Sequence, residues 1–312
     1  MLEGRILIGW LAVTLGLSSP FGALAQAPGA PKPPQAPEMR LSGERVVLPI
    51  VMVREFPFIE GSVAGVAGKL MLDTGHRKAL AINDRRVPVV DPVAVGRGSF
   101  GSGQTFDVRQ VPLVKDVRVG HLRYPHVSQV ESQDAAQLER ITPDFIGWLG
   151  HDFWEGYALK LDYRNAQAIF YRGAPDTYLR GENLIAELRY ESRKLPNIPV
   201  VTGKIAGIDA TVAFDSGQNG NLFIDAETKA RMIAEGALVR SGDGEKYDLS
   251  RLELQGTVFD GLKKIDVHTT PFPAAVPTGL GDKTLLTLGF SFLTNYKTVW
   301  DSKTKVIYVL EK

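Results

Sequence analysis

The chain of 312 residues contains no cysteine. This absence excludes disulfides, thiolate metal sites, a cysteine nucleophile and a lipid-anchored cysteine. An excess of one charge is lacking too, because 36 Lys and Arg residues nearly balance 35 Asp and Glu residues and leave a formal net charge of +1. Bulk charge therefore gives no reason to expect a nucleic acid, an anionic membrane surface or an acidic substrate as a partner.

The N-terminal apolar run is too short to favour a membrane anchor. The run at 6–17 has twelve residues, whereas a membrane-spanning helix needs about 20. It follows a weakly basic start and precedes Ala-Leu-Ala at 23–25, the small-x-small pattern that signal peptidase reads. We expect residues 1–25 to be a signal peptide cleaved after Ala25, with Ala27 as the second choice. The protein would then be exported to the bacterial periplasm or secreted, without stable membrane insertion.

The remainder of the chain has the composition of a globular protein, with 44% hydrophobic and 23% charged residues. Residues 26–44 begin with five prolines in fifteen positions and are expected to form an extended linker. The 32 glycines and 19 prolines suit many short strands and turns.

Two similar polar triplets interrupt apolar runs. Asp-Thr-Gly stands at 73–75, and taken alone it fits an ordinary strand that ends in a turn. Asp-Ser-Gly stands at 215–217, 142 residues later. The flanking residues agree as well, because 57–75 aligns without a gap with 199–217 and shares Pro, Gly, Ala-Gly, Asp and Gly. A second copy makes a functional role for both triplets the stronger interpretation.

A second pair of segments repeats in the same order. Residues 148–171 align with 287–310 through Leu-Gly, Phe, Tyr and Asp, at an offset of 139. Two different segments thus recur in the same order at offsets of 142 and 139 residues. This indicates an internal duplication, and its period is too long for a solenoid repeat. We expect two homologous lobes, at 45–175 and 182–312.

Both lobes are predicted to consist mainly of strands. Short runs of Val, Leu and Ile are bounded by Gly, Pro or Asp, at 45–53, 58–66, 69–73, 106–114, 158–163, 198–208, 210–215, 251–259, 265–270 and 305–310. Helices are few, and the clearest is expected at 225–239 with Asp225 as its N-cap. A shorter helix is expected at 132–141.

The chemistry expected of the two triplets depends on Asp73 and Asp215. Two carboxylates held a few ångströms apart share a proton, because like charge raises the pKa of one of them. The ionised partner can take a proton from water while the protonated partner binds the oxygen of a peptide carbonyl. Each loop must then bring its aspartate against the other, which favours small glycines and hydroxyl groups that bond across the loops, here Thr74, Gly75, Ser216 and Gly217.

This pattern resembles the aspartic proteases of the pepsin and retropepsin superfamily, arranged as two tandem retropepsin-like units in one exported bacterial chain. The family has an apolar pair before Asp-[Ser/Thr]-Gly and, later, an apolar-apolar-Gly segment that passes behind the active loop. The matching segments here are MLDTG with WLG at 148–150, and AFDSG with TLG at 287–289. The resemblance covers most of 45–312.

The resemblance implies two closed β-barrel-like lobes related by a pseudo-two-fold axis, with a peptide cleft between them and few helices. It implies that Asp73 and Asp215 are catalytic, that the four neighbouring triplet residues support the loops, and that Gly150 and Gly289 lie behind them. It implies a peptide or protein substrate, no cofactor and no metal, and a monomer that is an internal pseudo-dimer.

Family members also carry glycine-rich hairpins, called flaps, over the cleft. The segment 96–104 stands in the corresponding interval, and Gly98, Phe100 and Gly101 are its candidate flap residues. The segment 241–247 is the candidate in lobe two. The alternative is an ordinary surface hairpin. The Gly-x-Gly-x-x-Gly match at 96–101 does not indicate a dinucleotide site, because a strand-like segment follows it instead of a helix.

The residue after each triplet departs from the family, which usually has a small residue there. His76 and Gln218 occupy these positions, and either could modulate the site. A protonated His76 close to Asp73 would lower the pKa of that carboxyl. The alternative is that His76 is a solvent-facing turn residue.

Other polar and aromatic residues have simpler interpretations. No His-Glu-x-x-His or comparable spacing predicts a zinc site. Asp162 and Asp301 recur in the duplication, but each follows a predicted strand and is expected to stabilise a turn. Tyr157, Tyr296, Trp148 and Trp154 are expected to pack in the core, although the two tryptophans could instead line a cleft.

The sequence therefore favours a single-chain aspartic endopeptidase. The alternative is a non-catalytic peptide-binding or scaffold protein that keeps the two-lobed fold. A third arrangement, in which lobes pair between two chains, is less favoured because the segment near 172–182 is long enough to join the lobes within one chain.

Overall fold

The computed structural model describes residues 12–13, 39–242 and 244–312, and this part of the chain is mostly β. Strands make up 50% of the structure and helices 11%, so the mostly-β prediction is confirmed. Two residues of the predicted signal peptide form β1 (Ala12–Val13), which pairs with Ser99 and Phe100 of β7. The rest of that peptide and most of the predicted linker lie outside the described residues.

In lobe one, six strands close into a β-barrel. Their order is β4 (Phe56–Val63), β5 (Val66–Leu72), β10 (Phe145–Leu149), β6 (Leu80–Asn83), β9 (Leu122–Gln133) and β8 (Thr105–Val119). The pairing of β8 with β4 completes the ring. The same sheet is extended by β1, by β3 (Val51–Val53) and by β7 (Val93–Phe100).

The same pairings close a second ring in lobe two. The order is β14 (Val200–Ile205), β15 (Ile208–Phe214), β20 (Leu285–Leu288), β16 (Gly220–Phe223), β19 (Thr257–His268) and β18 (Tyr247–Leu254), and β14 pairs with β18. β17 (Leu238–Arg240) extends the sheet. β5 is parallel to β10 as β15 is to β20, and β6 is parallel to β9 as β16 is to β19. The two rings therefore have the same topology, as a duplication requires.

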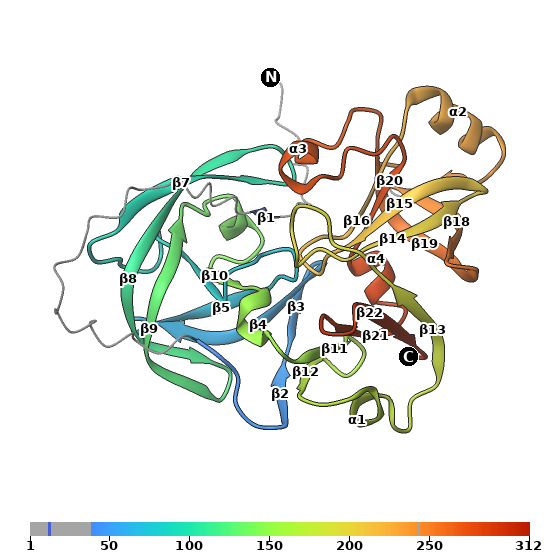
Figure 1. The fold of residues 1–312 in the computed structure, drawn as a ribbon. Helices are drawn as coiled ribbons and strands as arrows, with labels where there is room; N and C mark the ends of the chain where they lie inside the picture. Colours follow the sequence, from blue (N-terminus) through green and yellow to red (C-terminus); the bar gives the residue numbers. More distant parts are fainter. Residues whose placement is uncertain (1–11, 14–38, 243) are drawn as a thin grey trace, which may run out of the picture.

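A third sheet takes strands from both halves of the sequence. Its order is β13 (Leu184–Arg189), β22 (Val306–Leu310), β21 (Lys297–Asp301), β11 (Ala158–Asp162), β12 (Gln167–Tyr171) and β2 (Arg45–Pro49). β11 and β21 pair antiparallel at its centre. In the view of Figure 1 this sheet lies below and between the two rings. It joins the two lobes through continuous backbone hydrogen bonds.

Helical segments are short. They are α1 (Pro175–Leu179), α2 (Ala226–Ala234), α3 (Ala275–Thr278), α4 (Phe290–Leu293) and the 3₁₀ turns η1 (Leu138–Arg140) and η2 (His151–Trp154). Among the described residues, no helix is long and apolar enough to span a membrane.

The helix predictions were partly correct. Asp225 is the N-cap of α2, since its carboxylate accepts a hydrogen bond from the amide of Thr228 at 2.7 Å. The helix ends at Ala234 instead of 239, because the chain continues as β17. The helix predicted at 132–141 is wrong. Gln133 belongs to β9, where it pairs with Asn83 of β6, and a single 3₁₀ turn follows.

Three predicted strands continue past the end of one observed strand, through a turn, into the next. The ranges 58–66, 198–208 and 251–259 each contain a tight turn in which two successive residues have positive φ. The turn residues are Ala64-Gly65, Ala206-Gly207 and Gln255-Gly256, with φ between 47° and 86°. Positive φ at both central positions is the geometry of a two-residue turn between antiparallel strands. The first two turns occupy equivalent positions in the repeat.

The aromatic residues that were expected in the core lie there. Trp148, Trp154 and Tyr157 are at most 3% exposed. Tyr296 is partly buried, and its ring centroid lies 4.9 Å from that of Phe292. The polar residues of the two triplets follow directly after β5 and β15.

Candidate active site

The two Asp-[Ser/Thr]-Gly loops begin where β5 and β15 end. The amide of Asp73 donates to the carbonyl of Leu149 at 3.0 Å, and the amide of Asp215 donates to the carbonyl of Leu288 at 2.8 Å. Each aspartate thus leaves its strand while still bonded to the neighbouring parallel strand. The duplication places equivalent loops on equivalent supports.

Hydrogen bonds between the loops are reciprocal. The amide of Thr74 donates to the hydroxyl of Ser216 at 3.0 Å, and the amide of Ser216 donates to the hydroxyl of Thr74 at 2.9 Å. The Ser216 hydroxyl in turn donates to the carbonyl of Leu72 at 2.8 Å. All of these groups are buried, so the bonds hold the loops in one relative position without competition from water.

Each carboxylate lies over the glycine of the opposite loop. A Cβ atom placed on Gly75 would be 2.5 Å from Oδ2 of Asp215, and one on Gly217 would be 2.6 Å from Cγ of Asp73. Carbon atoms do not approach that closely. Glycine is therefore required at both positions by the neighbouring aspartate, because a side chain would push the two carboxylates away from the loops.

Backbone amides hold the inner oxygen of each carboxylate. Oδ1 of Asp73 accepts from the amides of Gly75 at 2.9 Å and His76 at 3.1 Å. Oδ1 of Asp215 accepts from Gly217 at 2.7 Å and, across the two loops, from Gly75 at 3.1 Å. The Oδ2 atoms are buried and receive no hydrogen bond from a backbone or other side-chain donor of the described chain. They are the oxygens left for chemistry.

Burial raises the pKa of both aspartates. The pKa of Asp73 is raised further by the charge of Asp215 and by the close contact between the two carboxyl groups. Burial raises the pKa of Asp215 to about 6, while the amide of Gly217, the contact with Asp73 and the amide of Gly75 limit the rise. Burial and like charge therefore favour a state in which the two carboxyl groups share one proton.

Gly150 and Gly289 lie directly behind the loops. A Cβ on Gly150 would be 2.4 Å from the carbonyl oxygen of Lys78, and one on Gly289 would be 2.0 Å from that of Gln218. The residues that follow complete the support, since His151 and Phe290 donate their amides to the carbonyls of His76 and Gln218 at 2.8 and 2.9 Å.

His76 is fully buried, so the interpretation of it as a solvent-facing turn residue is wrong. Its ring stacks on Trp148 with centroids 6.0 Å apart and an interplanar angle of 20°. Burial lowers the pKa of His76 to about 4, although Asp152 acts to raise it. The ring is therefore neutral at neutral pH, and it does not place a cation beside Asp73.

Gln218 is 2% exposed and points into lobe two. Its Oε1 accepts hydrogen bonds from Asn221 at 2.9 Å and from the hydroxyl of Thr287 at 2.6 Å. Thr287 occupies the repeat position of Trp148. Both lobes therefore pair the residue after the triplet with the residue two places before the glycine behind the loop, by stacking in lobe one and by hydrogen bonding in lobe two.

The candidate flap of lobe one is the hairpin of β7 and β8. Gly98 accommodates the ring of Phe106, which would be 2.4 Å from a Cβ at that position. Phe100 is 4% exposed and packs on Phe106, with centroids 4.5 Å apart, and on Trp148 at 6.5 Å. Gly101 begins the turn that joins the two strands. The hairpin is thus connected through Trp148 to His76 and the first loop.

The tip of this hairpin reaches lobe two. A Cβ on Gly103 would lie 2.9 Å from Cβ of Pro273, and Figure 1 shows α3, just after Pro273, beside the end of β7. In lobe two, the segment 241–247 joins β17 to β18, and the amide of Ser241 donates to the carbonyl of Lys246 at 2.9 Å.

The sequence patterns gave no indication of two residues that lie close to the loops. Asn197 is 4% exposed, and its Nδ2 donates to the carbonyls of Thr74 at 3.0 Å and Gly75 at 2.7 Å. Tyr163 follows β11, and its buried hydroxyl has a raised pKa because of burial and the nearby charges of Asp215 and Asp73.

Other candidates are confirmed as turn residues. The carboxylate of Asp162 accepts from the amide of Asn165 at 3.0 Å, and that of Asp301 accepts from the amide of Lys303 at 2.9 Å. Within residues 12–13, 39–242 and 244–312, no three His, Cys, Asp or Glu side chains gather in a way that could hold a metal ion.

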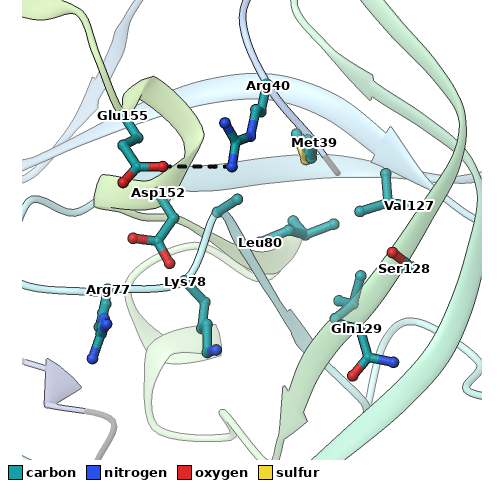
Figure 2. Close-up of a pocket in the computed structure, with 12 residues that line it drawn as sticks. Met39, Arg40, Arg77, Lys78, Leu80, Val127, Ser128, Gln129, Asp152 and Glu155 are labelled. Carbon is teal, nitrogen blue, oxygen red and sulfur yellow. Dashed lines mark ion pairs between the residues drawn. The ribbon is translucent and has the colours of Figure 1, made fainter. Parts of the chain in front are cut away.

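A pocket of about 240 Å³ lies beside the first loop on lobe one (Figure 2). Arg77 and Lys78, which follow His76, line it together with Asp152 and the ion pair of Arg40 with Glu155, whose N–O distance is 3.6 Å. Charges of both signs therefore face this pocket, and neither aspartate of the two triplets lines it.

No protein-family model matches the chain, and no curated protein matches it. Its function is therefore inferred from the geometry of the two loops and from the sequence pattern that predicted them.

Proposed function

We propose that this protein is an aspartic endopeptidase of the pepsin and retropepsin type, with one catalytic aspartate from each lobe. The observation that carries the proposal is the reciprocal position of Asp73 and Asp215, each over the glycine of the other loop. Burial, like charge and the Gly75 amide that both carboxylates share favour a pair that holds one proton. That state supplies a base and an acid in one site.

In the proposed reaction the charged Asp215 takes a proton from a water molecule as the water oxygen attacks the carbonyl carbon of the peptide bond. Asp73 gives its proton to the carbonyl oxygen, and a neutral gem-diol forms. The carbon–nitrogen bond then breaks while Asp215 returns its proton to the nitrogen, and a diol hydroxyl returns a proton to Asp73. The products are a carboxylic acid and an amine, and the pair regains its single proton.

The hairpin of β7 and β8 is the proposed flap. Asp73 and Asp215 are 1% and 0% exposed, so a peptide reaches them only when the covering segments move. The hairpin is the natural moving part because its tip contacts lobe two through Gly103 and Pro273 while its root continues into the barrel. Closure over a bound peptide would exclude bulk water from the reacting atoms.

The rest of the proposal follows from the same arrangement. Both loops lie in one chain and are bonded to each other, and the third sheet joins the lobes, which favours an active monomer. The N-terminal apolar segment supports export and cleavage after Ala25. The proposed substrate is a peptide or an unfolded segment of a protein, because the resemblance to the aspartic proteases implies that an extended chain binds between the two lobes.

The proposal is tested with the purified protein, in the form left after export, and a diverse peptide library from pH 3 to 8. We expect cleavage by the unaltered protein and none by Asp73→Asn or Asp215→Asn. Asp162→Asn is the matched control, because Asp162 is also buried but only stabilises a turn. Full activity in either dyad variant would refute the proposal. Peptide binding without cleavage at any pH would indicate a non-catalytic binding protein.

A further inference from the structure

Asn197 connects lobe two to the first active loop. It lies just before β14, and its Nδ2 donates to the carbonyls of Thr74 and Gly75 at 3.0 and 2.7 Å. Both partners are carbonyl oxygens, which only accept hydrogen bonds. The orientation of the amide is therefore fixed, with its nitrogen toward the loop.

The two carbonyls belong to the peptide groups whose N–H bonds hold the dyad. In the first group, the Thr74 carbonyl accepts from Asn197 while the Gly75 amide donates to both Asp73 and Asp215. In the second, the Gly75 carbonyl accepts from Asn197 while the His76 amide donates to Asp73. A hydrogen bond to a carbonyl polarises its peptide group and makes the N–H a stronger donor. One side chain thus acts on three of the four backbone bonds to the carboxylates.

Within the described part of the chain, the repeat position of Asn197 in lobe one makes a different contact. At the repeat offset of 142 residues, Asn197 corresponds to Glu55, whose carboxylate can only accept hydrogen bonds and pairs with Lys246 at 3.0 Å. The repeat position in lobe one therefore cannot supply an amide donor to the second loop. The asymmetry matters because two identical loops would hold two equivalent aspartates.

We propose that Asn197 is a positioning residue of the dyad, which strengthens the shared amide bonds and so favours the singly ionised pair. This inference rests on the proposed peptidase function for its catalytic consequence. Its structural basis is separate, since Asn197 touches the loop backbone and neither aspartate. The other titratable group that acts on the pair is Tyr163, which follows β11, whereas the ring of His76, on the same loop, stacks on Trp148.

The test compares the pH dependence of kcat and KM in Asn197→Ala and the unaltered protein. Loss of the donor makes the charged pair less stable, so the acid limb of kcat/KM should move to higher pH, by about 0.5 unit. We expect kcat at the optimum to fall about tenfold and KM to stay within about twofold, because Asn197 is buried behind the loop. Asn197→Ser, which keeps a hydroxyl, replaces the alanine variant if that variant does not fold.

Asn83→Ala is the matched control. Asn83, in lobe one, also has a buried side-chain amide that donates twice, to Glu139 at 2.9 Å and to the carbonyl of Phe145 at 3.1 Å, but it touches neither loop. We expect a similar loss of stability and an unchanged acid limb. An equal shift in Asn83→Ala would overturn the inference, because it would show general loosening of lobe one.

A readout independent of catalysis separates this inference from the proposed function. The carboxyl ¹³C resonances of Asp73 and Asp215 are titrated in the whole protein and in Asn197→Ala. An upward shift of the lower apparent pKa of the pair supports the role of Asn197 even if the protein cleaves no peptide. Titration within about 0.1 unit of the unaltered protein, where about 0.5 is expected, would overturn it even if the protein is a peptidase.

Discussion

The amide of Gly75 donates to Oδ1 of Asp73 at 2.9 Å and to Oδ1 of Asp215 at 3.1 Å. A single backbone group of one loop therefore binds the carboxylates of both. Such a shared donor draws the two oxygens toward one point, where like charge opposes the double ionisation of the pair. The loop geometry itself thus favours the state with one proton.

The first prediction concerns stability. The pKa of both dyad aspartates is raised in the folded protein above the ordinary value of 3.8. For such a group the stabilising contribution is present below pH 3.8 and is lost as the pH rises through the folded pKa. Asp73→Asn and Asp215→Asn should therefore increase the free energy of unfolding at pH 7, as measured by urea denaturation. For Asp215→Asn, whose folded pKa is about 6, the increase should be about 2–3 kcal/mol.

The control for this prediction is a substitution that should lower the free energy of unfolding instead of raising it. Burial acts to raise the pKa of Asp144, but hydrogen bonds from Lys69 and Thr142 outweigh it and leave the pKa lowered. Asp144→Asn should therefore destabilise the protein at pH 7. Destabilisation by all three substitutions would contradict the account of the dyad.

The second prediction is the pH range of cleavage. Below the pKa of Asp215, at about 6, both carboxyls are protonated and no base is present. Activity should therefore rise as the pH passes through about 6 and fall at higher pH, when Asp73 loses its proton. A profile of kcat/KM measured from pH 3 to 9 checks this, and a maximum below pH 4 would contradict it.

The third prediction concerns His76. Its folded pKa of about 4 lies below the ordinary 6.5, so the unfolded chain binds more protons between these values. The stabilising effect of the neutral ring is present above pH 6.5 and is lost as the pH falls toward 4, by about 3 kcal/mol. His76→Phe keeps a ring against Trp148 but does not titrate. The free energy of unfolding of His76→Phe, minus that of the unaltered protein, should therefore increase on going from pH 7 to pH 4.5. An equal difference at both pH values would show that the titration of His76 does not affect stability.

The fourth prediction tests the close approach of the loops. Gly75→Ala and Gly217→Ala would each place a Cβ within 2.6 Å of the opposite carboxyl group. Each should reduce kcat at least about a hundredfold, because a displacement of about 1 Å at reacting groups has effects of that size. Gly281→Ala, whose Cβ would meet only Ala275 at 3.9 Å, should retain activity. Normal turnover by either loop variant would show that the carboxylates need not remain over the glycines.

The fifth prediction addresses the hairpin. Phe100→Ala removes the contacts with Phe106 and Trp148, which should loosen the cover of the dyad. We expect faster amide hydrogen exchange in β7 and a drop in kcat/KM of about tenfold or more. Phe100→Leu keeps an apolar side chain, so its hydrogen exchange and kcat/KM should lie between those of the unaltered protein and those of Phe100→Ala. Unchanged exchange and activity would mean that this hairpin does not cover a substrate.

The sequence was sufficient to predict the parts of the site that the duplication repeats. Two triplets at equivalent positions pointed to Asp73 and Asp215 together, and the structure brings them into contact through loops of the same form. The glycines behind the loops, Gly150 and Gly289, were predicted from the resemblance to the aspartic proteases. Repetition is informative because two equivalent loops that meet at a pseudo-two-fold axis need the same small and hydroxyl-bearing residues.

Features without a local pattern could not be predicted. Asn197 contacts a loop that lies 122 residues away in sequence, and its neighbours carry no motif. The burial of His76 depends on Trp148, which arrives from another strand. The hairpin turns at Ala64 and Ala206 were missed because valine and isoleucine flank Ala-Gly in apolar runs that resemble one continuous strand.

The most direct test of the central claim is a double-mutant cycle on one cleaved peptide, with the unaltered protein, Asp73→Asn, Asp215→Asn and the double variant. A pair that acts as one unit predicts that each single substitution abolishes turnover and that the double variant is no slower than either. Folding of every sample is checked by urea denaturation, where the variants should be the more stable proteins at pH 7. Independent, additive losses, or substantial turnover by either single variant, would contradict the claim that Asp73 and Asp215 form a catalytic dyad.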